Sequence, residues 1–277
     1  FKQKTAYEIK ECDWSSDVCS SDLGMLGIDI AAKAAPDGYT IARGNLPALA
    51  VAPFVYKKMP YDPLRDLVPV SLTDVGQNLL AIHTTVQANN VRELIALMKA
   101  KPDELRMASP GVGSGGHLAG VLFTTLAGVK SLHVPYKSAG LSILAVVGNE
   151  TQWTFAPIGA PLPHVRSGRL KALAVGGEKR VPQLPDVPTA HEAGVTGYYS
   201  TSWGGVVVPK GTPPTIVTKL SAAIIKVLST ADAREQFLQG GGEASPTTPE
   251  AFAKFIRADY ERIGKTAKAA EIGRAHV

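Results

Sequence analysis

Cysteine is nearly absent from this chain of 277 residues, because Cys12 and Cys19 are its only two cysteines. A body without cysteine cannot hold a disulfide framework, and it suits an exported protein without proving export. No apolar run reaches the roughly 18 residues that a transmembrane helix needs. Basic residues exceed acidic ones by five, yet no run of five or six like charges occurs, so a nucleic-acid patch is not expected.

Metal and nucleotide motifs are missing as well. The six histidines are scattered, with no H-x-H or H-E-x-x-H spacing, and no Gly-Lys-Ser/Thr of a phosphate-binding loop occurs. We therefore expect no metal site and no cofactor. Hydrophobic residues make up 45% and charged residues 19% of the chain, which is typical of a soluble globular protein long enough for two domains.

The two ends of the chain differ from its body. Residues 1–23 are polar, lack hydrophobic periodicity, and lack the basic-then-apolar pattern of a signal peptide. The run from Lys2 to Asp22 resembles translated sequencing-adapter read-through, and the tail from Ile272 to Val277 resembles the same kind of artefact. We expect residues 1–23 to be a non-native, disordered extension, and neither end enters the fold prediction.

The middle of the chain alternates strand and helix patterns, which predicts an α/β sheet fold. Helices are expected at 28–35, 91–101, 138–147 and 189–193, and strands at 39–42, 68–72, 79–82, 170–175 and 203–208. The last third predicts three helices, the first of them capped by Thr212 with Pro213 at its first position.

The most informative stretch is Ser109-Pro-Gly-Val-Gly-Ser-Gly-Gly-His117, between an apolar strand-like run and an apolar-periodic helix. Glycines allow a sharp turn and a close approach of a ligand to the backbone. The first turn of the helix leaves N–H groups unpaired at the positive end of the helix dipole. The stretch predicts an anion site, although it also fits a plain strand-to-helix connection with a serine cap.

Two enzyme interpretations of this loop find little support. It contains G-x-G-x-x-G, but the first acidic residue after it is Glu150, too far along to hold a ribose. Ser114 lacks the nucleophile-elbow pattern, because Val112 stands where the first glycine belongs. An enzyme using the loop on a phosphate or acyl substrate remains the alternative, and it requires a base near Ser114. His117 either packs against the turn or shapes the ligand loop.

Several segments together resemble one family, the substrate-binding receptors of tripartite tricarboxylate transporters, also called the Bug family of periplasmic receptors. The resemblance covers roughly residues 24–270 and rests on the order and spacing of these segments: Ala34–Thr40, Tyr61–Asp66, Val91–Ile95, Ser109–Gly120, His133–Lys137, Leu162–Val175 and Leu184–Thr189.

The resemblance implies a type II periplasmic-binding-protein fold, in which two α/β domains close on a ligand. The first domain would comprise residues 24–103 with 209–271, and the second residues 104–208. Hinges would lie near 101–106 and 203–210. The first strand-loop-helix unit of the family's first domain is missing here, so we expect a gap in that sheet and lower stability than a full-length relative has.

The resemblance also implies the site and the function. The receptor would bind a small organic carboxylate in an interdomain cleft in the periplasm and deliver it to membrane permease subunits, as a monomer without catalysis or nucleic-acid binding. Ala156 stands where many members carry Asp, which argues against an amino-acid ligand, and Ser138 stands where Gly often follows Lys. The expected ligand-binding residues are Gly44, Asn45, Ser109, Gly113, Ser114, Gly115, Gly116, His117, Tyr136, Lys137, Phe155, Ala156 and Pro157.

Overall fold

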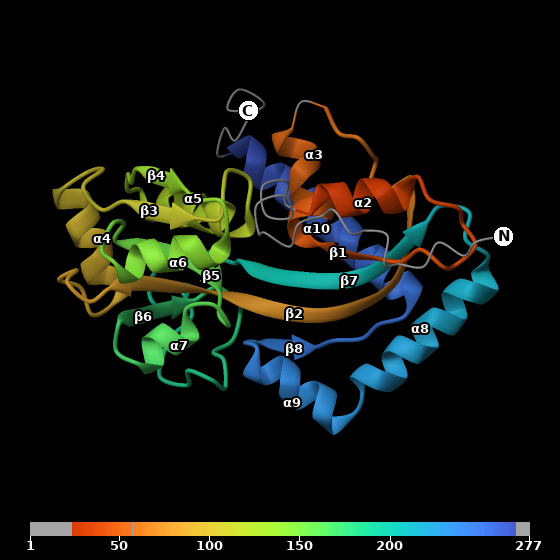
Figure 1. Ribbon diagram of the computed structural model, residues 1–277. Helices are drawn as coiled ribbons and strands as arrows, with labels where there is room; N and C mark the ends of the chain where they lie inside the picture. Colours follow the sequence, from red (N-terminus) through yellow and green to blue (C-terminus); the bar gives the residue numbers. More distant parts are fainter. Residues whose placement is uncertain (1–23, 57, 270–277) are drawn as a thin grey trace.

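The computed structural model describes residues 24–56 and 58–269. The predictions for residues 1–23 and for the tail lie outside this part of the chain. The described residues form one eight-stranded sheet, in the order β1-β7-β2-β5-β3-β4, with β6 and β8 also paired to β2 (Figure 1). The sheet mixes parallel and antiparallel strands and is flanked by helices, which confirms the α/β prediction.

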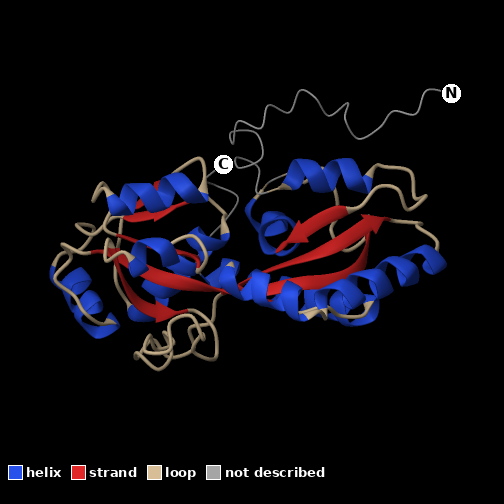
Figure 2. Ribbon diagram, turned by 60° about the horizontal axis from the view of Figure 1, so that its bottom comes forward, coloured by secondary structure: helices blue, strands red, loops and turns tan. Residues whose placement is uncertain are grey.

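The strand β2 (Leu67–His83) runs the length of the sheet and divides it into two halves. Its residues up to Gln77 pair with β7 (Thr201–Pro209), while those from Asn78 onward pair with β5 (Trp153–Pro157) and β6 (Leu170–Val175). Figure 2, with strands in red, shows these long strands passing between the halves. The predicted strands at 68–72 and 79–82 are therefore one continuous element.

The first half holds the N-terminal and C-terminal elements. Its strands are β1 (Ala42–Asn45), β7, the first part of β2, and β8 (Gly242–Ala244). Its helices are α2 (Met25–Ala32), the π-helix η2 (Pro47–Val51), α3 (Ala52–Val55), α8 (Pro214–Leu228), α9 (Ala231–Gln239) and α10 (Pro249–Ala269). Its core contains Leu49, Trp203, Val207, Phe252 and Ile256.

The second half holds the middle of the chain. Its strands are the end of β2, β3 (Met107–Ser109), β4 (His133–Pro135), β5 and β6. Its helices are α4 (Val91–Ala100), α5 (Gly115–Ala127), α6 (Ala139–Val147) and α7 (Leu162–Arg166). Its main core contains Leu80, Leu94, Met98, Phe123, Trp153 and Phe155.

Residues 79–103, which we expect in the first domain, contribute Leu80, Leu94 and Met98 to the core around Trp153 of the second half. Strand β2 changes its pairing partners between Gln77 and Asn78, and β7 begins at Thr201. Composition gives no signal at these points, because the connections are ordinary strands without a linker.

Helix boundaries follow local capping. Asn90 accepts a hydrogen bond from the backbone N–H of Glu93 at 2.9 Å, and α4 begins there, as predicted. The hydroxyl of Thr212 instead donates to the carbonyl of Pro209, and α8 begins at Pro214, so the predicted threonine cap is wrong. The expected helix at 189–193 is also absent: these residues form a bridge to β6 and turns.

Candidate functional site

Three parallel strands of the second half end at one edge of the sheet. Met107 of β3 lies opposite both His133 of β4 and Trp153 of β5, and all three strands run in the same direction. Their carboxyl ends therefore lead into neighbouring loops, the usual place for a ligand in an α/β sheet. The loops are those that the sequence singled out: 109–117 after β3, 136–137 after β4, and the end of β5.

Short backbone contacts hold these loops together. The N–H of Tyr136 donates to the carbonyl of Ser109 at 2.9 Å. Gly116 lies against β5 so closely that an added Cβ would be 2.5 Å from the carbonyl oxygen of Phe155. Only glycine permits this approach, so the predicted segments meet because of a specific glycine.

The first turn of α5 faces this junction with open backbone donors. Ser114 is the N-cap, and its hydroxyl accepts from the N–H of His117 at 3.2 Å. Gly111 and Gly113 turn the chain at φ 132° and 78°. Within the part of the chain that the structure describes, no hydrogen bond occupies the N–H of Gly115 or Gly116. Two free amides at a helix N-terminus form a site suited to an anion.

Two histidines lie beneath the loop. The rings of His117 and His133 stack with centroids 4.1 Å apart and planes 25° apart. Nδ1 of His117 accepts from the N–H of Gly113 at 3.1 Å. Nε2 of His133 lies 2.6 Å from the hydroxyl of Ser109. Because this hydroxyl donates its single proton to the carbonyl of Gly111, Nε2–H of His133 is the donor to Ser109. Burial lowers the pKa of each histidine to about 4, and for His117 the neighbouring His133 adds to this effect.

The first half reaches the same place through the residue after Asn45. Leu46 shares a small pocket with Gly115 and with Arg262 of α10, whose guanidinium lies 5.3 Å from the ring centre of Tyr199. Leu118 of α5 also packs into the core of the first half. The start of η2, directly after β1, therefore faces the N-terminus of α5 across the boundary between the halves.

Several predicted ligand residues have their side chains elsewhere. Gly44 is packed against Leu49 and Val207, while the side chain of Asn45 accepts from the N–H of Ala48 at 2.9 Å. Phe155 and Ala156 are fully buried, and Tyr136 packs beside Ala156 in the core under α6. Lys137 and Pro157 are exposed. The structure thus brings these segments together through their backbones, and Tyr136, Phe155 and Ala156 serve packing.

Sequence reasoning did not select Tyr199, Arg262 or His133 as individual site residues. Tyr199 and Arg262 lie more than 80 residues beyond the glycine loop, and nothing in their local sequence marks them. His133 stands in a segment that carries the family resemblance, but its contact with Ser109 depends on the pairing of β3 with β4. Only the tertiary structure shows these neighbours.

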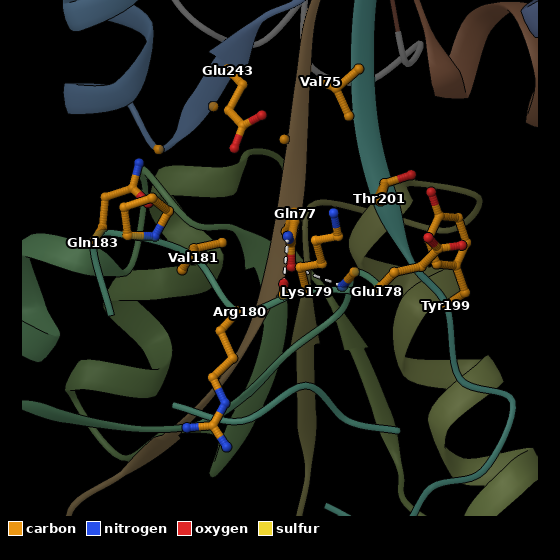
Figure 3. A pocket seen from close by; sticks show the side chains of 15 residues that line it. Val75, Gln77, Glu178, Lys179, Arg180, Val181, Gln183, Tyr199, Thr201 and Glu243 are labelled. Atoms are coloured by element: carbon orange, nitrogen blue, oxygen red, sulfur yellow. Dashed lines mark hydrogen bonds between the residues drawn. The ribbon is translucent and has the colours of Figure 1, made fainter. Parts of the chain in front are cut away.

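A second cavity lies at the crossing strands, between β8 of the first half and the 177–183 loop of the second (Figure 3). Its volume is about 310 Å³. The side chain of Gln77 fixes this loop, accepting from the N–H of Gly177 and donating to the carbonyl of Lys179, both at 2.9 Å. Figure 1 places β8 and β6 on the opposite side of β2 from β3 and β4. Tyr199 and Thr201 line both this cavity and the small pocket beside Gly115, so the two hollows adjoin at residues 199–201.

The bond pattern around Ser114 bears on the enzyme alternative. Its hydroxyl bonds to a backbone N–H, and no side chain of residues 24–56 or 58–269 forms a hydrogen bond with it. Ser109 does contact a histidine, but its side chain is fully buried and also bonds to Gly111. Among the described residues, Ser114 therefore has no hydrogen bond to a side chain that could act as its base.

Comparison with known proteins identifies the family. The model of the tripartite tricarboxylate transporter family receptor, TctC, matches residues 19–272. The chain belongs to this receptor family. It is similar to an R. palustris protein solved with adipate, at 33% identity and a TM-score of 0.86, over 90% of this chain and 83% of that one.

Two further structures agree with the membership in the TctC family. The periplasmic binding protein BugD is 29% identical with a TM-score of 0.83, over 90% of this chain and 84% of its own. MatC from Rhodopseudomonas palustris, solved with bound malate, is 30% identical with a TM-score of 0.81, over 88% of this chain and 84% of its own. The predicted resemblance to Bug receptors, the periplasmic-binding-protein fold and the function as a solute-binding receptor are confirmed. The described part of the chain contains no helix long and apolar enough to cross a membrane.

Proposed function

We propose that this TctC-family receptor binds a small organic carboxylate against the 109–117 loop, at the boundary between the two halves. The observation that carries the proposal is the pair of unoccupied N–H groups of Gly115 and Gly116 at the N-terminus of α5. The ligands of two neighbours, adipate and malate, are carboxylates. A carboxylate oxygen can accept hydrogen bonds from both N–H groups, and the positive end of the helix dipole stabilises its negative charge.

The start of η2 and helix α10, both of the first half, would complete the site. Leu46 and Arg262 belong to the first half and line a pocket with Gly115. We assign residues 24–77 and 201–269 to one domain and residues 78–200 to the other, since β2 changes partners after Gln77 and β7 pairs only with the first half. Rotation about these crossing strands would open and close the site.

The wider role follows from the TctC family. We propose that the receptor works in the periplasm, as BugD does by its description, and passes its ligand to membrane permease subunits. It would act as a monomer without catalysis. The bonds of Ser114 favour this over the enzyme alternative, because a receptor needs hydrogen-bond donors and no base.

The test is calorimetric titration and thermal unfolding of the full chain with adipate and malate. Adipamide is the matched control, since it has the same carbon skeleton without the charge. At 100 times its dissociation constant a ligand stabilises the folded state by about 2.7 kcal/mol. We expect stabilisation by at least one acid and none by adipamide. Equal effects of adipate and adipamide, or no effect of any acid in a panel of organic acids, would contradict the proposal.

Conversion of the ligand is checked in the same samples. Nuclear magnetic resonance spectra of each acid after prolonged incubation with the protein should show the unchanged compound. Appearance of a product would support the enzyme alternative.

A further inference from the structure

The shape of the 109–117 loop depends on two side chains. The hydroxyl of Ser109 accepts from the N–H of Gly111 and donates to its carbonyl, both at 3.1 Å. Nδ1 of His117 accepts from the N–H of Gly113 at 3.1 Å. Three backbone groups of the loop are thereby fixed directly before the free amides of Gly115 and Gly116.

These bonds require a defined protonation state. Nδ1 of His117 can accept only while it carries a lone pair, so its proton must lie on Nε2. His133 touches the hydroxyl of Ser109 on one side and stacks on His117 on the other. Burial lowers the pKa of both rings to about 4, so both are neutral at neutral pH.

Few charges near the pair interfere with this state. Besides burial, the charge of His133 lowers the pKa of His117, whereas burial accounts for the lowered pKa of His133. The first turn of α5 carries no acidic residue. After β4, Tyr136 interacts with Glu150 and Arg106. The charges of Glu150 and Arg106 do not contribute to the lowered pKa of either histidine.

We propose that His117 and His133 are positioning residues that hold the 109–117 loop in its ligand-binding shape only while both rings are neutral. Protonation of His117 turns Nδ1 into a donor that faces the N–H donor of Gly113, so this bond is lost. A second charge on His133, 4.1 Å away by ring centres, would then force the rings apart. The loop would open and release its ligand in acid. The ligand part of this inference rests on the proposed function, while the loop part does not.

The first test needs no ligand. Imidazole and amide resonances of the full chain, labelled with nitrogen-15, are followed from pH 7.5 to pH 3.5. We expect His117 as the Nε2–H tautomer, with a midpoint near 4, and the amide of Gly113 shifting with the same midpoint. In His117→Asn the Oδ1 atom replaces Nδ1 as acceptor without titrating, and the Gly113 shift should disappear. A Gly113 shift that persists in His117→Asn would overturn the proposal.

The second test measures the dissociation constant of adipate. At pH 7, His117→Phe, which keeps an aromatic ring but loses the acceptor, should bind about fivefold to tenfold more weakly than His117→Asn, which keeps an acceptor. Each protein is then compared with its own affinity at pH 7: at the His117 midpoint the wild type should have lost about twofold more affinity than His117→Asn, and about tenfold more one pH unit lower. The titration of adipate itself is common to both proteins and cancels in this ratio.

The outcomes separate the two proposals. Parallel pH profiles for wild type and His117→Asn, or wild-type affinity in His117→Phe, would overturn the positioning role. Failure of the wild type to bind adipate or any other carboxylate at pH 7 would instead contradict the proposed function. In that case the Gly113 resonance still decides whether the histidines control the loop.

Discussion

Replacing Gly116 by alanine tests the junction between α5 and β5. The new Cβ would lie 2.5 Å from the carbonyl oxygen of Phe155 and 3.2 Å from Cδ of Pro110. An ordinary carbon–oxygen contact is about 3.3–3.6 Å, so the first turn of α5 must move by nearly 1 Å. Overpacking of this kind costs about 1–3 kcal/mol, offset by up to about 1 kcal/mol of helix propensity.

The neighbouring residue gives the matched comparison. A Cβ on Gly115 would meet nothing within 4 Å, so Gly115→Ala gains helix propensity without a clash. We expect Gly116→Ala to lower the free energy of unfolding by about 1–2 kcal/mol and Gly115→Ala to leave it unchanged or raise it by up to about 1 kcal/mol. Urea unfolding followed by tryptophan fluorescence measures both.

The same variants can also be compared by their affinity for adipate. Both substitutions should weaken adipate binding, one by displacing the helix end and the other by placing a methyl group in the space beside the free amides. Gly140→Ala in α6 is the control: its Cβ would also meet nothing within 4 Å, and its affinity for adipate should equal that of the wild type. The reasoning is refuted if Gly116→Ala is as stable as Gly115→Ala, or if both bind adipate as tightly as the wild type.

Three further predictions concern stability. Since the pKa of His117 is about 4 in the folded state against 6.5 as its ordinary value, the unfolded chain takes up the proton first. The free energy of unfolding of the wild type should therefore fall as the pH drops from 6.5 to 4, and at pH 5 this loss should exceed that of His117→Asn by about 2 kcal/mol. Urea unfolding measures both proteins, and an equal pH dependence of their free energies of unfolding would refute the prediction. Asp259→Ala removes the acceptor 2.6 Å from Nε1 of Trp203 and should cost about 1–3 kcal/mol, with Asp259→Asn costing less. Gly159→Ala places a Cβ against the carbonyl of Gly240, so its melting temperature should fall, and an unchanged value would show that this contact yields freely.

Local sequence predicted much of the secondary structure. The run Leu170–Val175 forms β6 with the expected bounds, and Val91–Ala100 forms α4 within one residue of the predicted end. These elements have strong periodicity and clear caps or breakers. Thr212 misled the prediction, since a threonine before proline fits a cap equally well as a turn that bonds back to Pro209.

The features of the site also divide into those that local sequence predicts and those that depend on contacts between distant residues. The sequence singled out the 109–117 loop because glycines, a capping serine and a following helix are local features. It also named Tyr136 and Phe155, whose segments do meet the loop but whose side chains turn into the core. Which way a side chain turns depends on the register of β4 and β5 against β3, and that register is a long-range property.

Local sequence predicts the α/β class and an anion site at the glycine loop, and the order of the segments indicates the receptor family. These predictions follow from residues close in the chain, whose propensities and spacing act without distant partners. The place where the two halves meet, the sharing of β2 between them, and the contacts of His133 with Ser109 and His117 are visible in the folded chain alone. Such contacts join residues far apart in sequence, and they form only when burial and strand pairing fix the fold.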